Sequence, residues 1–334
     1  RTGTPQRHSG FSRDIQMSEA QITNPAAQIP HIRTLEEEAA IDAALAANRP
    51  LLVRGEPGTG KTQLAVAAAA WKKRPLVSLT VNAATTATEL LWTFDAVQRL
   101  TEAQVAGAVE KDKEKLREAV SLQRFVRPGP LWWAFNWQSA ADQVTQQALR
   151  QVPAGWSPAD GVVLLIDEID KGETDVPNGL LEALGSRQFT PTGWSSPITA
   201  DPGVQAPLIV ITTNEERSLP DAFVRRCLVL RLDLPVLTAQ ANEDKRAAED
   251  TVMIEFLMKR GQVHFPQLEE VLLREAAVQL VEDRRTAIQN QQRPWPGQAE
   301  YLDYLRVAAA GVITPEYQDI IRGLIFRKYR RDDR

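Results

Sequence analysis

Short apolar runs, separated by stretches with helical spacing, mark the first two thirds of the chain. Five of these runs have the length and the continuous apolar character of strands that are buried on both faces: 51–55, 76–81, 162–167, 206–214 and 228–232. The segments between them, such as 36–48 and 61–72, have the composition of helices. Strands that alternate with helices are typical of a parallel sheet covered by helices. The pattern therefore predicts an α/β domain built on a five-stranded parallel sheet.

Outside these strands the pattern changes in three places. Residues 1–30 are polar, with Gly, Pro, Ser and Gln scattered among them, and we expect them to form a tail. Within the core, which we place at 31–237, the segment near 101–127 is charged, and opposite charges recur three positions apart. This spacing favours an exposed helical insert. Residues 238–334 keep helical periodicity without a strand signal, which predicts a small all-α lid subdomain.

Three local patterns carry further expectations. Leu90, Phe94 and Val97 recur at i, i+4 and i+7 and predict an amphipathic helix. Residues 188–203 contain the Gly, Pro and Ser residues of a hairpin or loop. Four aromatic residues crowd one short segment, and we expect most of them in the core, with one or two as surface anchors for a partner: Trp132, Trp133, Phe135 and Trp137.

Composition narrows the class of protein without naming a function. The chain has 334 residues, of which 43% are hydrophobic and 25% charged, as in ordinary soluble proteins. A net charge of −4 offers no broad phosphate-binding field, so nucleic acid is not the expected partner. The single cysteine, Cys227, excludes an internal disulfide and suits a cytoplasmic location. We expect neither a transmembrane helix nor a signal peptide, because no apolar run is long enough for the first and the beginning of the chain lacks an apolar core.

The segment "GEPGTGKT", residues 55–62, lies directly between a predicted strand and a predicted helix. This context is that of a phosphate-binding loop, in which glycines let backbone N–H groups wrap phosphates at a helix N-terminus. Lys61 would neutralise the β- and γ-phosphates, and the Thr62 hydroxyl would bind Mg²⁺. The alternative is a chance glycine loop, against which the flanking strand and helix argue. We assign nucleotide binding to Glu56, Pro57, Gly58, Thr59, Gly60, Lys61, Thr62 and Gln63.

Acidic and amide side chains follow two other predicted strands. In "LLIDEID", Asp167 ends a buried strand, where a lone carboxylate is costly unless it serves an ion, and we expect it to hold Mg²⁺ through a water. Glu168 would then orient and polarise the attacking water. The alternative is a strand-end acidic cluster that also includes Asp170. Asn214 follows the next strand and can hold the water, although an isolated Asn at such a place is usually a turn former.

Two adjacent arginines, Arg225 and Arg226, end the segment "PDAFVRRC". One interpretation is that they are solvated cations at the end of a short helix, where the helix dipole favours positive charge. The other is that one of them completes the chemistry of a neighbouring molecule. The residues of this segment alone do not decide between the two.

Taken together, these motifs resemble those of the AAA+ ATPases, most closely the MoxR-like branch. The matching segments are "GEPGTGKT", "LLIDEID", "LLEALGSRQFTPTG", "ITTN" and "LPDAFVRRC", and "FVRPGPLWWAF" resembles the end of that branch's helix-2 insert. The resemblance covers residues 31–235. It implies an ATPase that needs Mg²⁺ and assembles into a ring, usually a hexamer, with ATP at the subunit interface. It also implies a protein client, with a von Willebrand A-type domain as the client domain of that branch.

The same resemblance gives the arginine pair and the lid specific expectations. An arginine of one subunit would reach the γ-phosphate held by the next, and position favours Arg226, with Arg225 as the near alternative. The family's lid carries a second sensor arginine early in a late helix. That position aligns here with Gln298 or Ala299, so the arginine is missing, and Arg293 or Arg306 would have to substitute for it.

Three functions are compatible with these residues. The first is a ring-forming ATPase that remodels or matures protein partners. The second is the NTPase motor of a nucleic-acid-directed restriction or defence system, supported by the basic end "RKYRRDDR". The third is a nucleotide-locked scaffold or sensor with little turnover, supported by the missing lid arginine. The presence of Glu168 favours turnover over the third.

Overall fold

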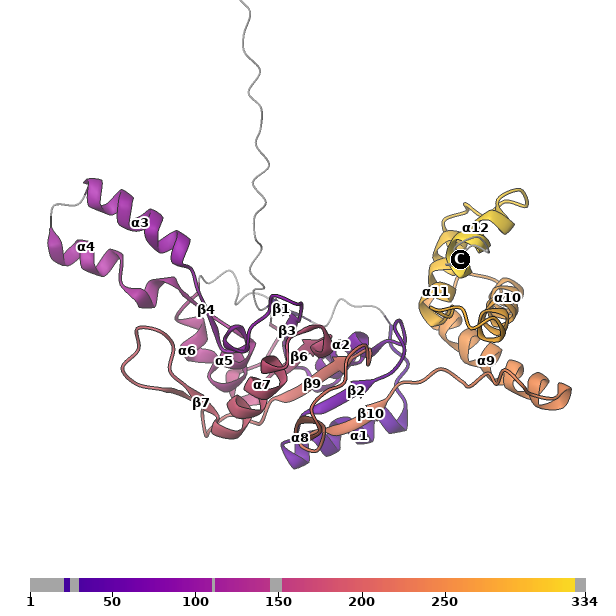
Figure 1. The fold of residues 1–334 in the computed structure, drawn as a ribbon, viewed down its shortest axis with the longest axis horizontal. Helices are drawn as coiled ribbons and strands as arrows, with labels where there is room; N and C mark the ends of the chain where they lie inside the picture. Colours follow the sequence, from indigo (N-terminus) through magenta and orange to yellow (C-terminus); the bar gives the residue numbers. More distant parts are fainter. Residues whose placement is uncertain (1–20, 25–29, 110–111, 145–151, 328–334) are drawn as a thin grey trace, which may run out of the picture.

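The structure is a computed structural model that describes residues 21–24, 30–109, 112–144 and 152–327. Apart from Arg327, the basic segment "RKYRRDDR" lies outside the described residues. No helix in the described ranges is long and apolar enough to cross a membrane. Figure 1 shows a central sheet with flanking helices, a projecting helical pair on one side and a separate group of helices on the other.

The predicted parallel sheet is confirmed. Its five parallel strands are β2 (Leu51–Arg54), β3 (Leu76–Thr80), β6 (Val163–Asp167), β9 (Leu208–Thr213) and β10 (Leu228–Arg231). They lie in the order β3-β6-β9-β2-β10. A sixth strand, β1 (Gln21–Thr23), pairs antiparallel with β3 at the edge of the sheet. It lies within the segment expected to be a tail, and three residues are too few to show strand periodicity in the sequence.

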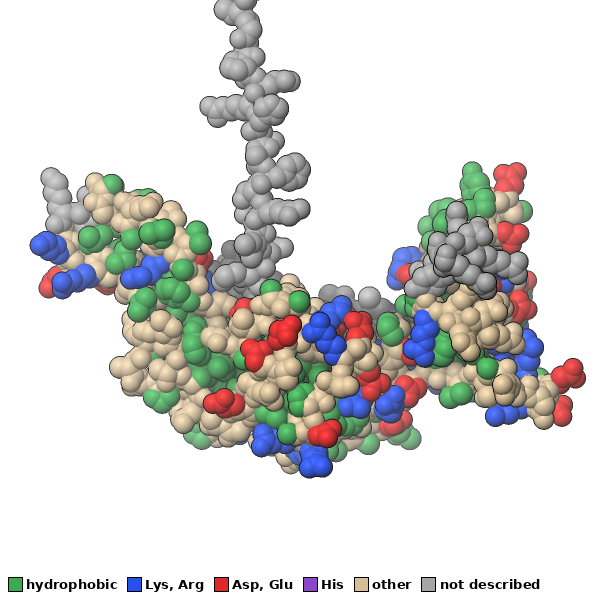
Figure 2. Space-filling model, in the orientation of Figure 1, with side chains coloured by type: hydrophobic (Ala, Val, Ile, Leu, Met, Phe, Trp, Pro, Cys, Tyr) green, Lys and Arg blue, Asp and Glu red, His purple; other side chains and the backbone are tan. Residues whose placement is uncertain are grey.

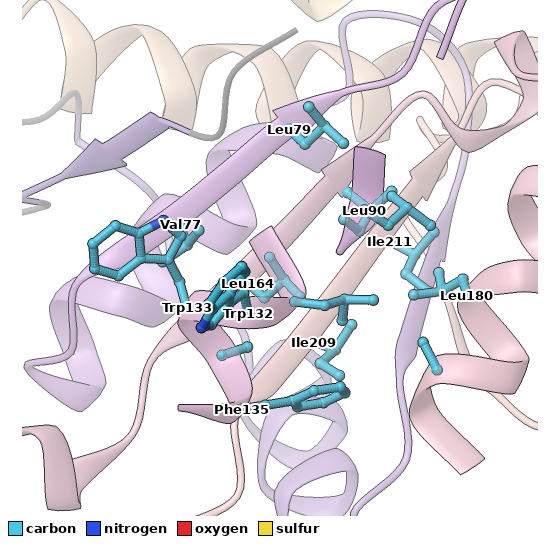
Figure 3. Packing of buried hydrophobic residues seen from close by; sticks show 14 of the residues in the cluster. Val77, Leu79, Leu90, Trp132, Trp133, Phe135, Leu164, Leu180, Ile209 and Ile211 are labelled. Atoms are coloured by element: carbon cyan, nitrogen blue, oxygen red, sulfur yellow. The ribbon is translucent and has the colours of Figure 1, made fainter. Parts of the chain in front are cut away.

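Both faces of the sheet are buried, and alternate residues of each strand serve different faces. Leu51 and Val53 pack with helices α1 (Leu35–Ala47) and α2 (Lys61–Lys72). Leu52, between them, joins the opposite cluster, which contains α5 (Pro130–Phe135) and α7 (Asp175–Ser186). Figure 3 shows this second cluster, in which Trp132 and Leu180 lie near strand residues such as Leu164 and Ile211. Burial on both faces explains why the strands are continuous apolar runs.

The predicted charged insert contains a helical pair, α3 (Ala96–Val109) and α4 (Lys113–Ala119), which projects from the core in Figure 1. It is followed by the short helix η3 (Leu122–Phe125) and strand β5 (Val126–Pro128). Phe125 and Val126 are buried in the core of the α/β domain. The last residues of the segment 101–127 therefore belong to the core rather than to the projecting pair.

The amphipathic helix predicted through Leu90, Phe94 and Val97 is wrong. Residues Ala87–Leu90 form the 3₁₀ helix η2, Trp92–Phe94 form strand β4, and α3 begins only at Ala96. Strand β4 pairs antiparallel with β5, with Phe94 opposite Val126. A pairing over such a distance in the chain overrides the local helical spacing.

The aromatic segment is core throughout. Trp132, Trp133, Phe135 and Trp137 are all buried, so the prediction that most are core is confirmed and none is a surface anchor. Trp137, which opens α6 (Trp137–Ala141), has its ring centroid 4.7 Å from that of Trp133. The expected hairpin is formed by β7 (Gln188–Phe189) and β8 (Ile198–Thr199), and the Phe189 ring packs 5.4 Å from the Trp132 ring.

The all-α lid is also confirmed. Its helices are α9 (Glu243–His264), α10 (Glu270–Gln289), α11 (Gln298–Ala309) and α12 (Gln318–Phe326). They enclose a hydrophobic cluster of their own, which includes Leu257, Leu280 and Leu305. Arg285 of α10 donates hydrogen bonds to Asp250 and Glu249 of α9, at 2.5 and 3.1 Å, and so ties the two longest lid helices together.

Three short helices complete the core. They are η5 (Pro158–Asp160), η6 (Ile169–Lys171) and α8 (Asp221–Val224). Helix η6 follows the carboxyl end of β6, and α8 lies just before β10. Because all five strands from β3 to β10 are parallel, the two short helices lie at opposite edges of the sheet. Figure 1 shows α8 beside the end of the sheet where β10 begins.

Candidate functional site

The loop between β2 and α2 has the conformation that the sequence motif requires. Gly58 and Gly60 have φ angles of 78° and 97°, in the left-handed region that glycine adopts without penalty. A Cβ atom on Gly58 would lie 2.7 Å from the Cβ of Ala299, so the loop also needs a glycine where the lid approaches. Helix α2 begins immediately after Gly60. Its free N–H groups and positive dipole end face the loop, which is the arrangement that binds phosphate.

Lys61 is buried in this loop. Its Nζ donates hydrogen bonds to the carbonyl oxygens of Gly55 and Glu56, each at 2.8 Å. Burial lowers the pKa of Lys61, and the negative charge of Asp167 opposes that shift. The ammonium group therefore lies inside the loop, within reach of an anion bound by the loop.

Thr62 and Asp167 meet at the base of the loop. The Thr62 hydroxyl lies 3.0 and 3.1 Å from the two carboxylate oxygens of Asp167. Thr212 of β9 donates a hydrogen bond to the same carboxylate at 2.6 Å. A hydroxyl and a carboxylate fit Mg²⁺, which prefers oxygen ligands and usually takes only one or two from the protein. Within the described part of the chain, no cluster of three His, Cys, Asp or Glu residues could hold a metal by itself.

Glu168 and Asn214 are brought together, as the sequence predicts. The Asn214 side-chain amide donates to one carboxylate oxygen of Glu168 at 3.2 Å. Lys171, which the sequence analysis did not single out, donates to the other at 2.7 Å. That hydrogen bond raises the pKa of Lys171. The two donors together hold the Glu168 carboxylate in one orientation.

The backbone at Glu168 is strained. Its φ of 57° lies in the left-handed region, which costs a non-glycine residue on the order of 1 kcal/mol or more. The Glu168 N–H donates to the Thr212 hydroxyl at 2.9 Å, which holds the residue in this conformation. Strained residues of this kind persist only where the surrounding structure holds them in place, and they occur most often at functional sites. It turns Glu168 away from the direction of β6.

Asp170 has a different role from its two acidic neighbours. It is buried, and its carboxylate accepts hydrogen bonds from the backbone N–H groups of Asn214, at 3.4 Å, and Glu216, at 2.9 Å. It therefore orders the segment that follows β9. The three acidic residues therefore do not act as one strand-end cluster. Asp170 has a structural role, whereas Asp167 and Glu168 line a cavity.

That cavity has a volume of about 640 Å³ and lies between the core and the lid. Volumes of this size are typical of small-molecule sites. The core lines it with the loop 57–63, Asp167, Glu168 and Asn214. The segment before α1 adds Pro30, His31 and Ile32, and the lid adds residues of α9 and α11, among them Phe256, Arg260, Gln298 and Ala299.

The beginning of α11 forms the part of the lid that lies next to the phosphate-binding loop. Gln298 and Ala299 begin α11 beside the loop, where the family's sensor arginine is expected. The Oε1 atom of Gln298 is buried and has no hydrogen-bond partner among the residues that the structure describes. Arg306 lines the cavity, but it is exposed and pairs with Asp303 of its own helix at 2.5 Å. Arg293 does not line the cavity, and its guanidinium lies 4.5 Å from the centre of the Trp295 ring.

A different lid arginine reaches the loop. Arg284 of α10 is buried, and its Nη2 donates to both carboxylate oxygens of Glu56, at 3.0 and 2.8 Å. Its Nη1 donates to the carbonyl oxygen of Pro296, just before α11, at 2.9 Å. Sequence reasoning missed this contact, because the two residues are 228 positions apart and no local pattern relates them.

Arg225 and Arg226 lie away from the cavity. Both are exposed, and neither side chain forms an ion pair or hydrogen bond within the part of the chain that the structure describes. They precede β10, which runs parallel to β2, whereas the phosphate-binding loop follows β2. The length of β10, about 13 Å at the usual rise per residue, separates the two ends. The structure therefore does not bring either arginine to the cavity of its own chain.

Comparisons with known proteins agree with this geometry. A family model described as an AAA domain of the dynein-related subfamily matches residues 50–227, just over half of the chain. No curated protein matches the chain.

Several solved structures resemble the chain at low identity. NtrX from Brucella abortus in complex with ADP is 15% identical, with a TM-score of 0.38, over 81% of this chain and 54% of that one. NtrX in complex with ATP is 14% identical, with a TM-score of 0.34, over 91% and 69%. PCH-2 from C. elegans is 14% identical, with a TM-score of 0.36, over 87% and 63%. The chain thus spans about half of the length of the ADP-bound NtrX chain.

Proposed function

Because this chain belongs to the AAA domains of the dynein-related subfamily, we propose that it is a ring-forming ATPase that couples Mg²⁺-dependent ATP hydrolysis to the remodelling or maturation of protein partners. The observation that carries the proposal is the convergence of Lys61, Asp167, Glu168 and Asn214 on one cavity between core and lid. Lys61 begins α2, Asp167 and Glu168 lie at the end of β6, and Asn214 follows β9, so the fold brings the ends of three elements together at the site.

The residues divide the work of phosphoryl transfer among them. The backbone N–H groups of the loop and Lys61 bind the phosphates, and Thr62 and Asp167 hold Mg²⁺. When bound, the metal supplies positive charge against the phosphate oxygens. Glu168 accepts a proton from the attacking water, and Asn214, already 3.2 Å from that carboxylate, orients the water. Such a general base contributes about 10²- to 10⁴-fold in rate.

The arginine pair completes the site from a neighbouring subunit. Arg226, with Arg225 as the alternative, is exposed, and its side chain has no hydrogen-bond or ion-pair partner among the described residues. It lies at the end of the sheet opposite to the phosphate-binding loop of its own chain. An arginine at this position does not reach the nucleotide cavity of its own chain, but it is exposed and can contact a nucleotide that is bound by a second copy of the chain. An arginine supplied in this way is worth about 10³-fold or more in related phosphoryl transfers.

A protein rather than a nucleic acid is the proposed client. Helix α3 of the projecting pair exposes the apolar side chains of Val97, Leu100 and Val105, at 77%, 62% and 58%. Exposed apolar side chains grouped on one helix are typical of protein contacts. The face in Figure 2 mixes basic and acidic side chains without a continuous basic band, which does not favour phosphate backbones. A client with a von Willebrand A-type domain is the specific proposal that the family resemblance supplies.

A slowly turning-over nucleotide switch is the second candidate. One observation supports it: Gln298 and Ala299, with which the family's lid arginine aligns, begin α11 next to Gly60 and Gly58 of the phosphate-binding loop, and neither is charged. An amide carries no charge, so the lid would respond less to hydrolysis. Such a protein would bind nucleotide with the same residues but release phosphate slowly.

The test is Glu168→Gln, with Glu173→Gln as the matched control. Glu173 is an exposed carboxylate five residues further along that pairs weakly with Arg217 at 3.8 Å. We expect Glu168→Gln to bind ATP as the wild type does and to lose about 10²-fold or more in turnover. The control should keep both properties. Wild-type turnover by Glu168→Gln would contradict the assigned role, and negligible turnover by an assembled wild-type ring would favour the switch.

A further inference from the structure

We propose that Arg49 is a positioning residue, which fixes the backbone turn that presents Arg225 and Arg226 to the neighbouring subunit. Arg49 lies between α1 and β2, outside every motif that the sequence analysis recognised. The inference rests on the proposed trans arginine and adds the element that holds it in place.

Arg49 binds three successive carbonyl groups of this turn. Its Nε donates to the carbonyl oxygen of Arg226 at 3.1 Å, and its Nη2 donates to that of Cys227 at 3.2 Å. The same Nη2 also donates to the carbonyl oxygen of Arg225. Helix α8 ends at Val224, so these carbonyl groups follow a helix end that leaves acceptors without helical partners. One guanidinium thus donates hydrogen bonds to all three of these carbonyl groups.

The chemistry of the contact is specific to arginine. A guanidinium presents several N–H donors in a rigid planar fork, which can span adjacent carbonyl groups. A lysine ammonium is a compact point charge at the end of a flexible chain and cannot bridge the same three oxygens. The approach of Arg49 is fixed by the backbone, because the neighbouring Pro50 carbonyl accepts a hydrogen bond from the N–H of Leu228 at 2.8 Å.

The turn depends on Arg49 because, within the described part of the chain, the side chains of Arg225 and Arg226 form no hydrogen bond or ion pair that could hold the turn in place. On the inner side, Phe223 is fully buried and the Cys227 thiol donates to the Phe223 carbonyl oxygen at 3.3 Å. On the outer side, the hydrogen bonds from Arg49 hold the backbone of residues 225–227. Errors of about 1 Å in a catalytic group cost on the order of 10²-fold in rate. A long exposed arginine can therefore reach a partner's phosphate reproducibly only if its backbone is fixed.

The position of Arg49 separates this role from nucleotide binding. It precedes β2, whereas the phosphate-binding loop follows β2, and it is not among the residues that line the nucleotide cavity. Any effect of Arg49 on turnover must therefore act through the turn. A subunit without Arg49 should therefore behave like a subunit without Arg226: it binds ATP normally but does not provide a correctly placed arginine to its neighbour.

The experiment is a complementation assay with mixed rings. The variants are Arg49→Ala, Arg49→Lys, Arg226→Ala and Glu168→Gln, and the control is Arg127→Ala. Arg127 is also half-buried and donates to a backbone carbonyl, that of Arg124 at 3.0 Å, but it lies in β5. ATP binding, turnover and subunit exchange are measured for each variant, and hydrogen exchange is measured for the amides of 225–227.

We expect Arg49→Ala to bind ATP normally and to lose roughly tenfold or more in turnover. Mixing it with Glu168→Gln should restore hydrolysis, because the Glu168→Gln neighbour supplies an intact turn. Mixing it with Arg226→Ala should restore nothing, because neither subunit then offers a placed arginine. Exchange at 225–227 should accelerate in Arg49→Ala, and Arg127→Ala should match the wild type in every assay. Arg49→Lys, which keeps a cation and the fold, should show the same complementation pattern with a smaller loss.

Two results would overturn the proposal. One is full turnover by Arg49→Ala or by Arg49→Lys together with unchanged exchange at 225–227, while Arg226→Ala is inactive. The other is rescue of Arg49→Ala by Arg226→Ala. Full turnover by Arg226→Ala would be a separate failure, that of the trans arginine itself, and the Arg225→Ala variant would then identify whether the neighbouring arginine carries the role.

Discussion

The contact between Glu56 and Arg284 offers a quantitative test of how the lid holds the nucleotide loop. Glu56 belongs to the loop and Arg284 to lid helix α10, and the pair is joined by two hydrogen bonds of 3.0 and 2.8 Å. Replacing Glu56 by alanine leaves a buried guanidinium without its carboxylate. Replacing Arg284 by methionine removes the buried charge and leaves a carboxylate that water can reach.

The two changes should therefore differ in cost. Removing one partner of a fully buried pair costs about 3–5 kcal/mol, whereas an exposed pair is worth less than about 1 kcal/mol. Arg284 is 5% exposed and Glu56 is 39% exposed, so the pair lies between these limits. We expect about 2 kcal/mol for Glu56→Ala and about 1 kcal/mol for Arg284→Met. The double variant should cost about as much as Arg284→Met alone, because the unpaired charge is gone.

The assay is urea unfolding of the four proteins, followed by circular dichroism, with ATP affinity measured in parallel. Glu173→Ala is the control, because Glu173 is exposed and its pair with Arg217 is long, at 3.8 Å. Its cost should stay within about 0.5 kcal/mol. Loosening the loop should also weaken ATP binding in Glu56→Ala. Strict additivity of the two single changes would refute the reasoning, because it would show that the pair does not couple lid and loop.

Three further predictions concern the site, the insert and the cysteine. Lys61→Ala should abolish tight ATP binding, measured by calorimetry, because the phosphates lose the cation inside the loop; binding at wild-type affinity would contradict this. Replacing 97–120 by a short linker should leave ATP binding and basal turnover intact, because the buried residues Phe125 and Val126 are retained. It should impair client activity, because the exposed apolar side chains of α3 are removed; loss of folding would show that the helical pair belongs to the core. Burial raises the pKa of the Cys227 thiol to about 11, whereas an ordinary thiol ionises near pH 8.5. Alkylation of Cys227 should therefore stay slow between pH 8.5 and 10 in the folded protein and become fast on unfolding. Rapid alkylation of the folded protein at pH 8.5 would contradict the burial.

Local features of the sequence predicted most of the parallel sheet and the nucleotide loop. The strand runs were legible because burial on both faces demands continuous apolar residues, and the loop because its glycines and Lys61 are adjacent in the chain. The sequence assigned Glu168 and Asn214 to the same attacking water, and the structure places the Asn214 amide 3.2 Å from the Glu168 carboxylate. Their functional roles remain predictions.

The contacts that were missed join residues far apart in the chain. Arg284 lies 228 positions from Glu56, and Arg49 lies 177 positions from Arg226. An arginine that will bind a carboxylate or a carbonyl group looks, in the sequence, like any solvated cation. Strand β4 was predicted as a helix for a related reason, because its spacing is helical and only its pairing with β5 makes it a strand.

The central claim, that a neighbouring subunit completes the ATPase site, is tested most directly by the dependence of specific activity on protein concentration. Phosphate release per chain is measured over a dilution series, and the fraction of assembled protein is measured in parallel by mass photometry. The account predicts that activity per chain rises with the assembled fraction and vanishes in the monomer, because Arg225 and Arg226 do not reach the cavity of their own chain. A constant activity per chain down to fully monomeric protein would contradict it.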